Sequence, residues 1–247
     1  MIIYSPLEQF RVYPIISFFY ERLSFTNSAF FLLLNLAIIT LIAYGVSRNA
    51  TIIPTPYQIM LESLYTFIRD MVDDILGDDG RKYFPLFFFL FLFIFTCNLF
   101  GLVPYSFTVT SHIIVTFTLA LSLFIGINII GFRTHKLHFF SIFMPSGISI
   151  ALAPFLITIE IISYISRVFS LSIRLFANML AGHCLLKILA GFVWTMLTYG
   201  GILAILTPFP FVIVIGITGL EVAIAFLQAY VFTILSCMYL NDAINLH

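Results

Sequence analysis

Long apolar stretches separated by short polar segments dominate the chain. Residues 28–47 form the first stretch, and residues 83–132 form a second that contains no Asp, Glu, Lys or Arg. About 20 apolar residues are enough to cross a bilayer as a helix, so the second stretch is too long for one crossing. A glycine, a proline and a serine interrupt it near its middle. The pattern therefore predicts transmembrane helices at 28–47, 84–103 and 112–132, the last two joined by a tight turn.

The segment 56–77 has a different period. Its apolar residues recur at the three- and four-residue spacing of a helix with one apolar face. The opposite face carries charged residues: Glu62, Arg69, Asp70, Asp73 and Asp74. This pattern predicts an amphipathic helix lying on the membrane surface. A water-soluble helix packed against a partner is the alternative.

Two further apolar segments, 152–192 and 209–241, are compatible with helix over their whole length. They would measure about 60 Å and about 50 Å, whereas the hydrocarbon core of a bilayer is about 30 Å thick. Both helices must therefore either kink or lie steeply across the membrane, and their length does not decide which.

The composition fixes the class of protein. Of the 247 residues, 62% are hydrophobic and 9% are charged, and the mean hydropathy is +1.12. A soluble domain has about a quarter charged residues, so we expect an all-α integral membrane protein with one membrane domain over residues 1–247. An acid and a proline near the start argue against a cleavable signal peptide.

Several other functions are disfavoured. The net charge of zero argues against nucleic acid as a partner. No P-loop, HExxH or GxSxG motif is present, so we expect no nucleotide bound by this chain and no hydrolytic site. The three cysteines lie apart in apolar segments, which suggests neither a metal site nor a disulfide framework. We expect no cofactor.

Basic residues between alternate spans indicate the orientation. By the positive-inside tendency, this side faces the cytoplasm, or the matrix in a mitochondrion, which places the N-terminus outside and the C-terminus inside. The basic residues concerned are Arg48, Arg69, Arg81, Lys82, Arg133 and Lys136.

Arg174 lies in one of the most apolar parts of the chain and keeps its charge in any surroundings. An arginine at the centre of a membrane helix costs roughly 2.5–3.5 kcal/mol on insertion scales. Three roles would justify it: a structural ion pair with Glu160 or Glu221, recognition of an anionic substrate in a carrier, or contact with a carboxylate on another subunit. In the last role its charge would control when that acid releases its proton.

Other polar residues accompany Arg174 at matching depth. If Gly200 and Gly201 form the tip of an antiparallel hairpin, three pairs lie level with each other: Arg174 with Gln228, His183 with Glu221, and Glu160 with Asp242. Glu160 and Arg174 share a helix face, and Asn178 lies near it, whereas His183 lies about half a turn away. These groups are typical of stations on a proton path, for which histidine is suited by its pKa near neutrality.

The segments "LSIRLFANMLAGH", "KILAGF" and "LEVAIAFLQAYVFTILSCMYLNDAINLH" resemble subunit a of F-type ATP synthases, in its mitochondrial form. The resemblance covers most of the chain and is strongest from about residue 150. It implies one transmembrane helix, an amphipathic surface helix, a transmembrane pair and two long, steeply tilted helices that form a hairpin. It also implies a proton-translocating stator subunit that couples proton flow to rotation of a ring of c subunits and to ATP synthesis.

The resemblance assigns roles to particular residues. Arg174 is the essential arginine that faces the carboxylate of the c-ring and separates two aqueous half-channels. His183 and Glu221 belong to the intermembrane half-channel. Asn178 and Gln228 position the arginine and line the path. Glu160, with Asp242, lies at the matrix exit.

The resemblance also predicts where the chain works and with what partners. It implies the mitochondrial inner membrane as the location, with a c-ring, a peripheral stalk, other membrane subunits of the ATP synthase and the lipid bilayer as partners. The chain would not be catalytic alone. The alternative is a proton-pumping or quinone-binding membrane subunit of a respiratory complex, which should show repeated spans with several buried charges. No such repeat is evident.

Overall fold

The computed structural model describes residues 5–18, 23–48, 51, 53–103, 106–143 and 153–245. Within this part of the chain, five helices are long and apolar enough to cross a membrane. The chain is therefore a multi-pass, helical membrane protein, which is the class that the composition predicts. The five helices are α1 (Asn27–Arg48), α3 (Phe84–Gly101), α4 (Ile113–His135), α5 (Ala153–Tyr199) and α7 (Pro208–Ile244).

Helix α5 has 47 residues and α7 has 37, so both are longer than the sequence analysis proposes. Leu152, the proposed first residue of the fourth span, lies outside the described residues. Helix α5 continues to Tyr199 because no helix-breaking residue follows 192 until Gly200. Gly200 and Gly201 have φ angles of +68° and +62°, a conformation that glycine adopts without steric cost. The short helix α6 (Gly201–Leu206) then leads into α7.

Helix α2 (Pro56–Leu76) covers the segment with the amphipathic pattern. Proline at its first position has no N–H to leave unsatisfied, and Gly77 ends the helix with a φ of +60°. Ile68 and Val72 are fully buried on one side, while Arg69 and Asp73 form an exposed i, i+4 ion pair at 3.6 Å. The 3-10 helix η2 (Gly77–Lys82) follows.

The N-terminal region contains two short strands that the hydrophobic pattern did not reveal. Strands β1 (Pro14–Phe18) and β2 (Leu23–Thr26) pair antiparallel, after the 3-10 helix η1 (Pro6–Phe10). Asn27 joins them to α1, since its side chain accepts a hydrogen bond from the Tyr13 N–H and donates one to the Arg11 carbonyl. Two strands of four and five residues are too short to give a strong period-two signal.

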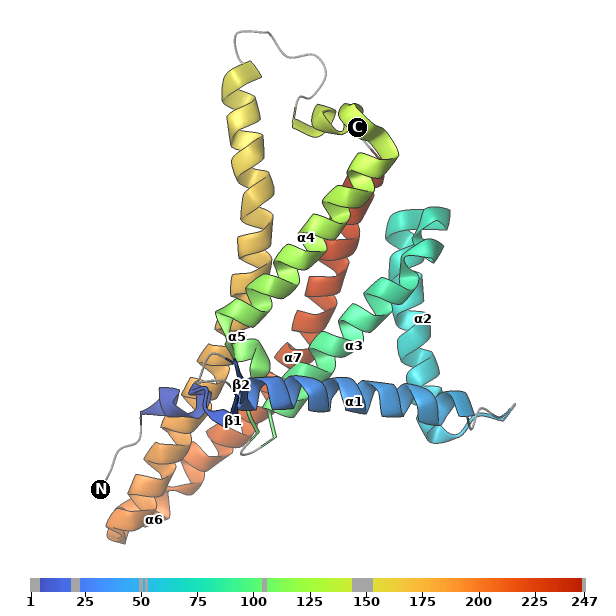
Figure 1. Cartoon of the computed structure of the whole chain (residues 1–247). Helices are drawn as coiled ribbons and strands as arrows, with labels where there is room; N and C mark the ends of the chain where they lie inside the picture. The colour runs from blue at the N-terminus through green and yellow to red at the C-terminus, as the bar shows by residue number, and fades with distance from the viewer. Residues whose placement is uncertain are drawn as a thin grey trace. The chain divides into compact units, whose positions relative to one another are not determined.

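The chain divides into two compact units, each built from separate stretches of sequence. Unit 1 comprises Met1–Ile42, Phe93–His112 and Leu175–Ala229. In it, the second part of α5, α6 and the first part of α7 form a hairpin, with α6 at the turn (Figure 1). The end of α3 packs on α7, where the rings of Phe95 and Phe226 meet at a centroid distance of 5.7 Å. The 3-10 helix η3 (Val109–Ser111) also belongs to this unit.

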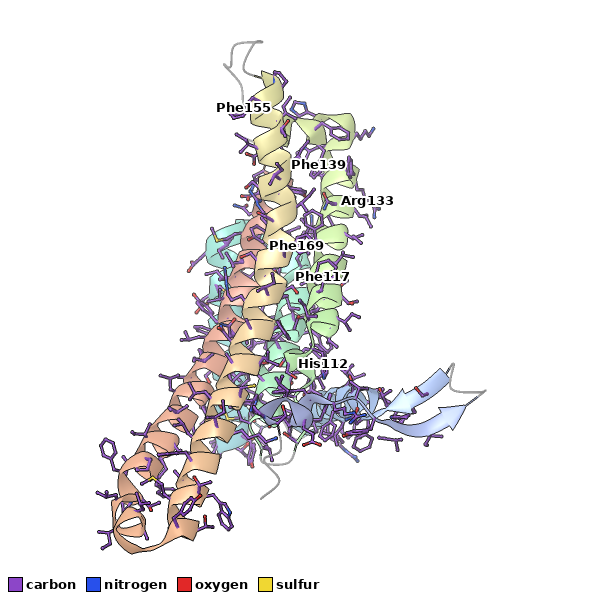
Figure 2. All side chains as sticks on the ribbon, turned by 90° about the vertical axis from the view of Figure 1, so that its left-hand side faces the viewer. His112, Phe117, Arg133, Phe139, Phe155 and Phe169 are labelled. Carbon is purple, nitrogen blue, oxygen red and sulfur yellow. The ribbon has the colours of Figure 1, made fainter. Side chains whose placement is uncertain are left out.

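Unit 2 comprises Ala43–Leu92, Ile113–Arg174 and Tyr230–His247. Aromatic rings join α4 to the first part of α5, as the rings of Phe117 and Phe169 show at 5.3 Å (Figure 2). The 3-10 helix η4 (Lys136–Phe143) folds back on the end of α4. There Phe139 is 1% exposed and lies directly over Gly131.

Candidate functional site

Unit 1 contains a buried carboxylate. Glu221 on α7 is 6% exposed, and neither of its carboxylate oxygens has a hydrogen-bond partner among the described residues. The carboxylate lies against the backbone of Gly182 on α5, where an added Cβ would be 2.7 Å from Glu221 Oε1. Gly182 therefore provides the space in which the carboxylate reaches the helix beside His183.

The imidazole of His183 is held by residues from two other segments. Its Nε2 lies 3.2 Å from the hydroxyl oxygen of Thr108. The ring of Phe10 packs edge-on against it, with a centroid distance of 6.2 Å. The carboxylate of Glu221 thus lies against Gly182 of α5, and the oriented imidazole belongs to the next residue of that helix, His183.

A group of polar side chains that the sequence analysis did not select lies in the same unit. Asn98 is fully buried; its amide donates to the Ala225 carbonyl at 3.4 Å and its oxygen accepts from the Thr110 hydroxyl at 2.9 Å. The neighbouring Thr108 and Ser111 are also buried. Their signal in the sequence is the hydroxyl-rich run "SFTVTS" at 106–111, which follows an otherwise apolar helix.

Asn178 and Gln228 are less closely tied to this group. Asn178 is exposed on α5, and Gln228 is half-buried on α7. Within the described part of unit 1, neither side chain forms a hydrogen bond. They remain candidates on the strength of the sequence alone.

The second group of charged residues lies in unit 2. Arg167 on α5 and Asp242 near the end of α7 form an ion pair, with Nη1 3.3 Å from Oδ2. The guanidinium also lies over the rings of Tyr164, at 5.6 Å, and Tyr239, at 5.1 Å. The Tyr164 hydroxyl donates to Asn128 at 2.7 Å. Three side chains therefore hold Arg167: Asp242, which supplies the opposite charge, and the rings of Tyr164 and Tyr239.

Glu160 and Arg174 belong to the same unit and the same helix. Fourteen residues separate them, or about 21 Å along the axis, so they do not form the ion pair that the sequence left open. Glu160 is half-buried and, within the described part of unit 2, has no ion pair with Asp242. Arg174 is half-buried next to the buried Leu175. The described residues of unit 2 supply no hydrogen bond or ion pair to its guanidinium.

His112 precedes α4 and packs its ring on that of Phe107, with a centroid distance of 5.1 Å. Figure 2 shows it at the start of this helix. Its packing on an aromatic ring agrees with a structural role at the turn.

Together these features define a class of protein. A multi-pass membrane protein gains nothing in stability from placing a carboxylate, an imidazole and an arginine in apolar helices, and such residues mark ion or proton pathways. The groups present here, carboxylate and imidazole, accept and release protons, and no cluster of three metal-ligating side chains occurs among the described residues. These groups are typical of a proton-conducting membrane protein.

Comparison with known proteins identifies the family. The ATP synthase A chain family matches residues 29–241. The chain is 53% identical to ATP synthase subunit a of Chondrus crispus, over 100% of this chain and 98% of the relative. It is 52% identical to the subunit a of Marchantia polymorpha, over 98% and 99%, and 49% identical to that of Rhodospirillum rubrum, over 99% and 100%.

This chain belongs to the ATP synthase A chain family. It is a proton-translocating stator subunit of an F-type ATP synthase. The alternative of a respiratory-complex subunit is therefore set aside.

Proposed function

We propose that the chain conducts protons through two half-channels that meet a ring of c subunits on either side of Arg174. One half-channel would use His183 and Glu221, and the other would use Asp242 with Glu160. Each c subunit would offer one carboxylate to Arg174 in turn, so that proton flow drives rotation of the ring and ATP synthesis. The chain would contribute no catalytic site of its own.

The arrangement around Glu221 is the observation that carries this proposal. A carboxylate without a hydrogen-bond partner in an apolar setting is costly as an anion and inexpensive when protonated. Such a group accepts a proton readily from a neighbouring acid, such as an imidazolium. The imidazole at the adjacent position of α5 is a suitable partner, since its pKa in water lies near neutrality.

The pair of Arg167 and Asp242 supports an exit on the opposite side. Asp242 is about half exposed, so its carboxylate is in contact with the surroundings of the protein as well as with Arg167. Glu160 lies two helical turns before Arg167 on the same face. A proton released from the ring would pass these two acids on its way out.

Arg174 would keep the two half-channels apart. A protonated ring carboxyl is neutral and tolerates lipid, whereas an ionised one is stabilised by a guanidinium. The ring would therefore turn only when each carboxyl gains a proton on one side and loses it on the other. A proton crossing in this way carries about 2.3 kcal/mol per 100 mV of membrane potential.

Other parts of the proposal concern the surroundings. The chain would lie in the mitochondrial inner membrane with the N-terminus on the intermembrane side, although the bacterial relative from Rhodospirillum rubrum shows that the family is not confined to mitochondria. Helix α2 would lie on the membrane surface, and α5 and α7 would cross steeply against the c-ring. A peripheral stalk and other membrane subunits would hold the chain in place.

The test replaces Arg174 in the intact, reconstituted ATP synthase. ATP-driven proton pumping should be lost in Arg174→Ala and in Arg174→Lys, since lysine lacks the planar fork and has a lower pKa. Arg133→Ala, which removes an exposed cation from the end of α4, is the matched control and should pump normally. Undiminished pumping by Arg174→Ala in an assembled complex would refute the proposal.

A further inference from the structure

Thr108 is the only hydrogen-bond partner of the His183 ring in the described part of unit 1. Its side chain is 4% exposed, and its hydroxyl oxygen lies 3.2 Å from Nε2 of His183 and 3.4 Å from the Gly101 carbonyl. The two residues are 75 positions apart in the sequence. The contact therefore depends on how the segment after α3 folds back on α5.

Thr108 is held firmly on both sides. The Ser111 hydroxyl donates to the Thr108 carbonyl at 2.6 Å. The methyl group of Thr108 lies so close to Gly101 that an added Cβ there would be 2.6 Å from Cγ2. A side chain fixed in this way can orient the group that it touches.

The Gly101 carbonyl offers the Thr108 hydroxyl an acceptor at 3.4 Å and also lies 3.3 Å from the Ser106 hydroxyl. Gly101 ends α3, where carbonyl groups have no partner within the helix and seek one from nearby side chains. A carbonyl only accepts, and threonine has a single hydroxyl proton. When the Thr108 hydroxyl donates to the Gly101 carbonyl, its oxygen remains free to accept the Nε2–H of His183.

We propose that Thr108 is a positioning residue for His183, which fixes the tautomer protonated at Nε2 and leaves Nδ1 as the nitrogen that exchanges protons. A proton arriving at Nδ1 converts the ring to imidazolium, and the same proton leaves from Nδ1 toward Glu221. The Nε2–H keeps its hydrogen bond to the Thr108 oxygen in both steps.

This inference rests on the proposed role of His183 in proton conduction, and the experiment separates the two. It compares Thr108→Val with Thr108→Ser in the reconstituted ATP synthase. Valine keeps the branched shape that fits against Gly101 but lacks the hydroxyl, whereas serine keeps the hydroxyl and loses the methyl group. Thr116→Val is the matched control, since Thr116 is also buried, at 1% exposure, and its hydroxyl bonds within unit 2.

ATP-driven proton pumping should fall about two- to tenfold in Thr108→Val, the worth of one net hydrogen bond. Thr108→Ser should recover most of the rate, and Thr116→Val should retain it. Nitrogen-15 NMR of the histidine-labelled complex should show native His183 protonated at Nε2, and a mixture of tautomers in Thr108→Val. A purely structural role would not produce this change in tautomer.

Three results would overturn the inference. Equal losses in the valine and serine variants would show that shape matters rather than the hydroxyl. A native His183 protonated at Nδ1 would contradict the assigned tautomer, whether or not the variants assemble. Normal pumping by Thr108→Val, with pumping lost in His183→Gln, would remove the role of Thr108 and leave the proposed function intact. Normal pumping by His183→Gln would refute the role of His183 itself.

Discussion

At the scale of single residues, Gly182 controls where a carboxylate lies. The Glu221 side chain occupies the space that any larger residue at 182 would need, so the two positions act together. The end of a glutamate side chain moves easily, and a substitution at 182 is therefore expected to displace the carboxylate while the helices stay in place.

We predict that Gly182→Ala lowers ATP-driven proton pumping at least about tenfold with normal assembly of the complex, because small displacements of reacting groups have large effects on rate. Gly191→Ala on the same helix is the control, since nothing lies within 4 Å of a Cβ added there. Pumping rates in reconstituted vesicles measure the difference. Equal rates in the two variants would show that the position of the Glu221 carboxylate does not matter.

The sequence reveals the charged members of the site more readily than the neutral ones. Glu221 and His183 stand out because ionisable residues are rare in apolar helices. Thr108 does not stand out, since serine and threonine in helices and turns commonly bond to nearby backbone. Its contact with His183 depends on a turn whose geometry the sequence pattern does not determine. The sequence pattern likewise did not identify Asp242 as the partner of Arg167, which the structure places beside it.

At the scale of elements, the hydrophobic pattern locates the helices but not the irregular segments. Long apolar runs bounded by glycine, proline or charge give strong signals, and the helices of the structure occupy these runs. The short strands β1 and β2 and the 3-10 helices give weak signals because they contain few residues. Helix α5 extends beyond the proposed end at 192 because apolar composition alone does not show where a helix stops.

The packing of η4 on α4 depends on a small residue. A Cβ at Gly131 would clash with the ring of Phe139, which is a buried aromatic side chain. Gly131→Ala should therefore destabilise this contact by about 1–3 kcal/mol, as overpacking commonly does.

The measurement is the temperature at which the detergent-solubilised complex loses this subunit. Gly131→Ala should lower it, whereas Gly126→Ala on the same helix, which has nothing within 4 Å of the added Cβ, should not. An unchanged temperature for Gly131→Ala would mean that η4 does not pack on α4 through Phe139.

At the scale of the whole molecule, the distribution of basic residues predicts the orientation in the membrane. Exposed cations lie at the end of α4 and around η2, whereas the stretch 106–111 between α3 and α4 has none. By the positive-inside tendency, we expect the end of α4 to lie on the matrix side.

We predict that a cysteine replacing Thr134 reacts with a membrane-impermeant maleimide only from the matrix side, and that one replacing Ser24 reacts only from the opposite side. Both positions are exposed. Labelling of sealed vesicles of each orientation tests this, with the native chain and its three cysteines as background. Reaction of both cysteines from one side would contradict the proposed topology.

The hairpin of α5, α6 and α7 has a consequence for how the protein is made. Between Lys187 and Glu221 the chain carries no Asp, Glu, Lys or Arg, and its turn consists of two glycines in a conformation that needs no side chain. Moving one charged side chain into the membrane centre costs roughly 2.5–3.5 kcal/mol on insertion scales. This stretch avoids that cost, because it carries no charged side chain across the membrane when the tip of the hairpin is translocated. We therefore expect the two halves of the hairpin to insert as a single unit, with the residues proposed to conduct protons at its base.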